Sequence, residues 1–165
     1  MQIPFGNNQA FLTSDSDIWR QFQKKFYTEY HYNTDYRYNV IKDVAQISIS
    51  ELQKKQNRQE KFISTVNFGG IKVLLYLTKM DGINVCIYMD RLKRKMYITN
   101  YRFEDEVFNG TLFTGELIQR NDDKYIFVIG DLVVHNNTNI LKSHNIIQRL
   151  GIVKEILDTK YIEDV

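Results

Sequence analysis

The spacing of apolar residues in the amino-terminal third of the chain predicts helices. Ile18, Phe22 and Phe26 recur every four residues, which is the period of one face of an α-helix. A Ser-Asp-Ser sequence just before them is typical of a helix start. A second helical pattern covers residues 41–57. Residues 1–13 follow neither the helical nor the strand period, so we expect them to be irregular.

From residue 61 onward the pattern changes to that of β-strands. Several segments rich in β-branched and aromatic residues are joined by short polar links. These segments are residues 61–68, 71–79, 83–90, 95–103, 110–118 and 124–134. Links this short join antiparallel neighbours, because a parallel crossover needs a dozen or more residues. The sequence therefore predicts an antiparallel β-meander.

The end of the chain returns to a helical pattern. Ser143 is the expected helix cap, and an apolar stripe follows it at Ile146, Leu150, Val153 and Leu157. Helices that flank an antiparallel meander define an α+β fold. We expect two parts, a helical segment over residues 1–60 and the sheet with its last helix over residues 61–165.

Composition sets the class of protein but selects no function. A chain of 165 residues with 43% apolar residues can bury the core of one domain. The net charge of +2 gives no argument for nucleic-acid binding, so any basic surface must be local. Cys86 is the only cysteine, which excludes an intrachain disulfide, and we expect it in the core. No apolar run is long enough for a membrane span, and we expect a cytoplasmic protein.

Candidate chemistry lies in the strand region. Lys79-Met80-Asp81-Gly82 reads K-x-D-G at the end of one predicted strand, with Asp81 and Gly82 forming the turn into the next. Gly115-Glu116-Leu117 lies within a later strand, and Asp131 ends an apolar one. Each residue also has a plain interpretation, because Lys79 could be a solvated strand-end lysine, Glu116 an outward-facing side chain and Asp131 a cap.

Taken in order, these segments resemble the covalent nucleotidyltransferase superfamily of mRNA capping guanylyltransferases and ATP-dependent polynucleotide ligases. Residues 79–82 are similar to motif I, residues 115–117 to motif III, and residues 125–132 to motif IIIa. The closest likeness is to capping guanylyltransferases of large DNA viruses, which implies a viral cytoplasmic factory or a virion as location. It covers about residues 70–157, the first half of an ATP-grasp-like nucleotidyltransferase domain.

The resemblance implies a covalent mechanism. Lys79 would be the nucleophile that takes GMP from GTP, or AMP from ATP in a ligase, and the nucleotide would pass to the 5′ diphosphate end of an RNA. Asp81, Gly82 and Glu116 would bind the nucleotide, and Asp131 would bind Mg²⁺ or Mn²⁺. Lys79 and Glu116 should then face one cleft.

Several positions depart from the family pattern. Motif I usually has an arginine five residues after its lysine, where this chain has Asn84. Thr114 replaces the usual motif III aspartate, and Gly130 stands where an aromatic residue commonly precedes the motif IIIa aspartate. The later motifs and the oligonucleotide-binding fold are not found, so we expect a further domain or a partner chain to complete the site. A non-catalytic scaffold or RNA-binding subunit is the alternative outside enzymes.

Two other features have a plain and a functional interpretation. The basic run at residues 91–95 is either a solvated hairpin tip or a contact for RNA phosphates. Gly69 and Gly70 precede a strand and do not open a helix, so they are not predicted to form a phosphate-binding loop. The three histidines do not cluster with Cys86 or with acidic residues at the spacing of a zinc site.

Overall fold

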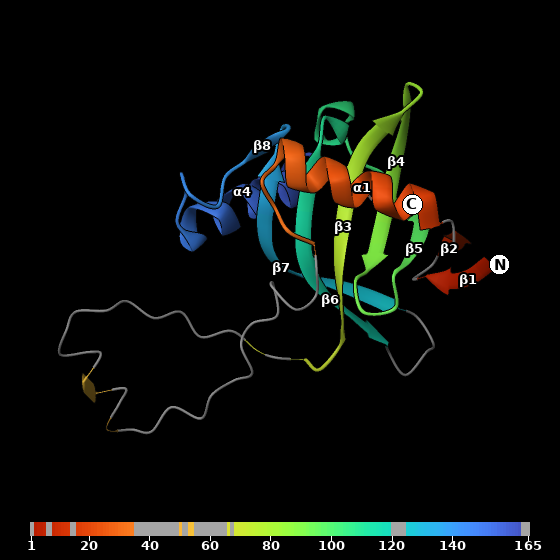
Figure 1. Ribbon diagram of the computed structural model, residues 1–165. Coiled ribbons are helices and arrows are strands. Elements are labelled where there is room, and N and C mark those ends of the chain that lie inside the picture. Colours follow the sequence, from red (N-terminus) through yellow and green to blue (C-terminus); the bar gives the residue numbers. More distant parts are fainter. Residues whose placement is uncertain are drawn as a thin grey trace.

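The computed structural model describes residues 2–5, 8–13, 16–34, 50, 53–54, 66, 68–119 and 125–162. Its strands form one antiparallel sheet in the order β1-β2-β5-β4-β3-β6-β7-β8, with helices packed on it (Figure 1). The strands are β1 (Gln2–Phe5), β2 (Asn8–Thr13), β3 (Ile71–Met80), β4 (Ile83–Asp90), β5 (Lys95–Thr99), β6 (Thr111–Gln119), β7 (Tyr125–His135) and β8 (Thr138–Asn139). The helices are α1 (Ser16–Glu29), the 3-10 helix η1 (Asp105–Phe108) and α4 (Ile146–Thr159).

The predicted α+β class is confirmed, with two differences at the amino-terminal end. Residues 1–13 are not irregular as predicted, because β1 and β2 lie there and join the sheet at the edge of β5. Val66 and Phe68, in the expected first strand, belong to no helix or strand. Most of the predicted helix at residues 41–57, and the rest of residues 61–68, lie outside the described residues.

The centre of the sheet is the pairing of β3 with β6. β3, β4 and β5 form a meander, but β6 then returns to the other edge of β3 and does not pair with β5. The register places Lys72 opposite Glu116 and Leu77 opposite Thr111. The order of strands in space therefore differs from their order along the chain at two steps, because β2 pairs with β5 and not with β3, and β6 pairs with β3 and not with β5.

The two faces of the sheet carry separate cores. Leu74 and Tyr76 of β3 point to one face, where they pack with residues of α1. Figure 1 shows α1 lying across the sheet. Val73, Leu75 and Leu77 point to the other face, where they pack with η1 and α4. Successive side chains of a strand alternate between faces, so even-numbered residues of β3 face α1 and odd-numbered ones face α4.

Helix α1 is held over β3 by aromatic contacts, and its predicted apolar stripe is confirmed. The Phe26 ring meets the Tyr76 ring edge-on, with centroids 4.8 Å apart. The Tyr30 hydroxyl lies 2.8 Å from the Tyr76 hydroxyl and donates a hydrogen bond of 2.6 Å to Asn137 Oδ1. Burial raises the pKa of Tyr30, so it stays neutral and able to donate. These contacts fix the carboxyl end of α1 beside β8.

Helix α4 begins later than predicted. Asn145, and not Ser143, is its cap: the Asn145 side chain accepts the Gln148 N–H, and the Gln148 side chain accepts the Asn145 N–H. From this start Val153 and Ile156 are the residues that become buried, whereas Leu157, expected in the buried stripe, is 41% exposed. Successive helix residues are about 100° apart, so the burial of Ile156 turns its neighbour Leu157 away from the sheet.

Cys86 lies in the α4-side core, as predicted. It is 2% exposed, and its thiol donates to the Tyr101 carbonyl at 3.3 Å. Burial raises the pKa of the Cys86 thiol to about 12, so the group is not a nucleophile at neutral pH. In the described part of the chain, no helix combines the length and apolar character that crossing a bilayer requires.

Candidate functional site

The K-x-D-G segment forms the tip of the β3–β4 hairpin. Asp81 and Gly82 have φ angles of 51° and 79°, as the two-residue turn of a tight hairpin requires. Lys79 and Asn84 face each other across the hairpin, and both contact Asp105 of η1, at 2.6 and 3.2 Å. The hydrogen bond from Lys79, followed by that from Asn84, lowers the pKa of Asp105 below its ordinary value. In this structure the two side chains join η1 to the hairpin.

Glu116 lies at the opposite end of β3, where β6 pairs with Lys72. The Lys72 ammonium is 3.8 Å from Glu116 Oε1, and the Gly70 N–H donates to Glu116 Oε2 at 3.1 Å. The Lys72 and Glu116 side chains are 30% and 18% exposed, so the pair is partly screened from water. Glu116 thus has a cation and a backbone donor already placed around its carboxylate.

The prediction that Lys79 and Glu116 share one cleft is wrong. Lys79 lies seven residues along β3 from Lys72, the partner of Glu116, which at a strand rise of about 3.3 Å per residue is roughly 23 Å. The two side chains also point to opposite faces, because Lys79 has the parity of the α4-side core and Lys72 that of the α1-side core. Neighbouring motifs in the sequence are therefore separated by the length of a strand.

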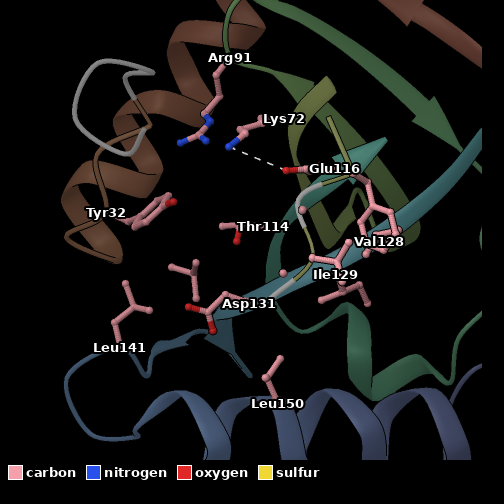
Figure 2. A pocket seen from close by; sticks show the side chains of 15 residues that line it. Tyr32, Lys72, Arg91, Thr114, Glu116, Val128, Ile129, Asp131, Leu141 and Leu150 are labelled. Atoms are coloured by element: carbon pink, nitrogen blue, oxygen red, sulfur yellow. Dashed lines mark ion pairs between the residues drawn. The ribbon is translucent and has the colours of Figure 1, made fainter. Parts of the chain in front are cut away.

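A cavity of about 640 Å³ surrounds Glu116 on the α1 side of the sheet (Figure 2). Thr114, Gly115 and Glu116 of β6 and the adjoining residues of β7 form its floor. Its lining residues are Tyr32, Val66, Phe68, Lys72, Arg91, Thr114, Gly115, Glu116, Val128, Ile129, Gly130, Asp131, Val133, Leu141 and Leu150. It contains two of the predicted site residues, Glu116 and Asp131, and neither Lys79, Asp81 nor Gly82.

Positive charge gathers at one end of this cavity. Figure 2 shows Lys72 and Arg91 side by side above Glu116, with Asp131 at the far end. Arg91 is only 8% exposed, although it carries a permanent charge. A cationic wall partly withdrawn from water attracts an anion more strongly than an exposed one does, because the effective dielectric constant is lower. The cavity is thus suited to a phosphorylated ligand.

Asp131, the predicted metal ligand, is held by an arginine. Arg149 of α4 donates to both of its carboxylate oxygens, from Nε at 2.7 Å and from Nη2 at 2.8 Å. This hydrogen bond is the main cause of the raised pKa of Arg149. The pair joins α4 to β7 and closes the far end of the cavity.

The described residues do not fit a metal ion held by the protein. Mg²⁺ and Mn²⁺ take oxygen ligands, above all carboxylates. Glu116 faces Lys72 and Asp131 faces Arg149, and no three His, Cys, Asp or Glu side chains of the described residues gather at a suitable spacing. We therefore derive no step through a metal, and the metal role of Asp131 stays a prediction.

Lys72 and Arg91 are the cavity residues that sequence reasoning missed. A signal for Lys72 was present, because motif I places its cation two residues after a glycine, and Gly70-Ile71-Lys72 has that spacing directly at the start of β3. In that register the motif lysine falls on Asn67, which lies outside the described residues. The K-x-D-G match drew attention to the hairpin instead.

A comparison with protein families identifies the family of the chain. Residues 16–164 match the family model described as mRNA capping enzyme, catalytic domain. The match spans most of the chain, including α1, all of the sheet from β3 onward and α4. The chain belongs to the mRNA capping enzyme catalytic-domain family.

Gly115→Ala should destabilise the cavity floor. A Cβ at Gly115 would lie 2.2 Å from the Val128 carbonyl oxygen and 2.6 Å from the Phe127 ring, so β6 and β7 would have to separate. We expect a loss of about 1–3 kcal/mol in the free energy of unfolding, measured by urea denaturation. Gly130→Ala is the matched control, since its nearest contact is 3.6 Å, and should change stability by less than about 1 kcal/mol. Equal effects of the two variants would contradict the β6–β7 register.

Proposed function

We propose that the cavity is the nucleotide-binding pocket of a guanylyltransferase-type domain and that it holds the triphosphate of GTP. The family match supports a nucleotide of the capping reaction. The observation that carries the proposal is the grouping of Lys72, Arg91 and Glu116 in one cavity, contributed by three different strands or their ends. Its volume of about 640 Å³ lies within the usual range for small-molecule pockets.

Different lining residues suit the phosphates, the ribose and the base of a nucleotide. Lys72 and Arg91 supply N–H donors with positive charge for phosphate oxygens, the strongest class of hydrogen bond available to them. Glu116, 3.8 Å from Lys72, can accept from the ribose hydroxyls. Val128, Ile129 and Leu141 provide apolar surface for a base.

GTP affinity should depend on Lys72 and not on Lys79. Lys72→Ala removes one charge-assisted contact, worth about 1.5–3 kcal/mol, so the Kd for GTP should rise roughly tenfold to a hundredfold by titration calorimetry. Lys79→Ala is the matched control, because it removes a lysine from the same strand outside the cavity, and should leave the Kd nearly unchanged. A weaker affinity in the Lys79 variant alone would contradict the site. ATP in place of GTP tests the ligase alternative.

Covalent guanylyl transfer is the second candidate function, and family membership favours it. In that reaction a neutral lysine amine attacks the α-phosphorus of GTP. The N–P bond forms, the bond to pyrophosphate breaks, and the amine loses a proton to solvent. An oxygen of the RNA 5′ diphosphate then attacks the same phosphorus and releases the lysine.

The geometry supports binding more directly than it supports this covalent step. Lys79, the predicted nucleophile, lies outside the cavity and donates to Asp105. Lys72 lies inside it but forms an ion pair with Glu116, and an ammonium ion has no lone pair for attack. The motif position before Gly70-Ile71-Lys72 carries an amide, Asn67. These observations favour a domain that binds its nucleotide without forming a bond to it.

A denaturing gel separates the two candidates. We expect the protein incubated with α-³²P-GTP and Mg²⁺ or Mn²⁺ to carry no label, and the Asn67→Lys variant to gain it, because a lysine then occupies the motif position. Label on the unaltered protein that Lys79→Ala abolishes would establish Lys79 as the nucleophile and reject the binding-only function. Label lost only in Lys72→Ala would assign the reaction to Lys72.

A further inference from the structure

We propose that residues 91–95, which are the β4–β5 turn and the first residue of β5, bind the phosphates of an RNA chain whose 5′ end occupies the cavity. We call this Arg-Leu-Lys-Arg-Lys segment the basic turn. The proposal rests on the proposed function in one respect, since it places the RNA 5′ phosphates where the triphosphate of GTP would lie. It assigns the next part of the RNA to a surface outside the cavity.

The basic turn begins inside the cavity and leaves it. Asp90, the last residue of β4, pairs with Val73 of β3, the neighbour of Lys72. The turn therefore lies at the end of the sheet where the cavity is. Arg91 lines the cavity beside Lys72 and is buried, whereas Lys93, Arg94 and Lys95 are exposed. Positive charge is thus continuous from the cavity to the surface.

The outer charges of the basic turn are available to a polyanion. Among the described residues, no acidic side chain forms an ion pair with Lys93, Arg94 or Lys95. Some other exposed cations are engaged, as Lys154 is with Asp158 and Lys79 with Asp105. The basic turn itself contains no acidic residue, although the whole chain has a net charge of only +2. The local excess of positive charge therefore comes from the clustering of basic residues in this segment and not from the overall composition.

The backbone of the basic turn is already ordered. Asp90 is 2% exposed. Its carboxylate accepts hydrogen bonds from the backbone N–H groups of Leu92 and Lys93, at 3.0 and 2.9 Å. Arg94 has a φ of 53°, which lets the chain reverse into β5, and Lys95 pairs with Asp90. A turn held in this way loses less conformational entropy on binding than a flexible one.

An RNA phosphate backbone fits this arrangement for chemical reasons. Exposed lysine and arginine side chains supply positive charge and N–H donors for phosphate oxygens, and contacts to phosphates carry no base information. Each phosphate contact on a single strand releases counterions and contributes about 0.7 to the slope of log K against log salt concentration. The basic turn should therefore add affinity that depends on salt and not on sequence.

The test compares RNA and GTP binding in a turn variant that carries the three changes Lys93→Gln, Arg94→Gln and Lys95→Gln. The probe is an RNA of about 12 nucleotides with a 5′-triphosphate, titrated over about 50 to 200 mM salt. We expect the salt slope for RNA to fall by about two in the turn variant, from three contacts at 0.7 each, with the Kd for GTP unchanged. A second variant, Lys24→Gln with Lys142→Gln and Lys154→Gln, removes the same charge from exposed positions outside the cavity and should keep the slope.

Three results would overturn the proposal. They are an unchanged slope in the turn variant, an equal loss in the matched charge variant, and equal affinity for the same RNA carrying a 5′-hydroxyl. The last would show that the 5′ end is not held in the cavity. Failure of the proposed function is a separate result, because it would appear as GTP binding that Lys72→Ala does not weaken, whatever the RNA slope.

Discussion

The register between β3 and β6 is the constraint on which the rest of the structure depends. Lys72 opposite Glu116 fixes which residues of both strands face α1 and which face α4. Because side chains alternate with a period of two, a slip of one residue would move Lys72 into the apolar core and Leu75 out of it. The apolar cores on both faces of the sheet oppose such a slip, because it would disrupt the packing of each. The position of the cavity is therefore determined by packing far from it.

The cavity follows from where strand ends meet. The start of β3 and the ends of β4 and β6 lie at the same end of the strands. Lys72, Arg91 and Glu116 therefore come together although they are distant in sequence. β7 adds an aspartate that Arg149 pairs with, and Lys72 and Arg91 lie with Glu116 at the other end of the cavity. This is the arrangement expected of a pocket for phosphate groups, with the basic turn continuing from it.

Local patterns predicted the local structure well. The apolar stripe of α1, the strands from β3 to β7 and the Asp81-Gly82 turn depend on residues close in sequence. The site depends on pairing between distant strands, which no local pattern contains, so Lys79 and Glu116 were grouped although a strand length separates them. Asp-Gly is also ordinary hairpin chemistry, so a K-x-D-G sequence does not by itself indicate a catalytic lysine. Lys72 was missed because the K-x-D-G match placed motif I at the hairpin and not at Gly70-Ile71-Lys72.

Affinity labelling of lysines tests most directly whether Lys72, and not Lys79, is the lysine of the nucleotide pocket. GTP oxidised with periodate carries a 2′,3′-dialdehyde that forms an imine with a lysine near the ribose, and cyanoborohydride makes the link permanent. Mass spectrometry of the digested protein then locates the adduct. We predict an adduct on Lys72 that excess unmodified GTP suppresses, with only unsuppressed background elsewhere. A GTP-suppressible adduct on Lys79, with none on Lys72, would contradict the account.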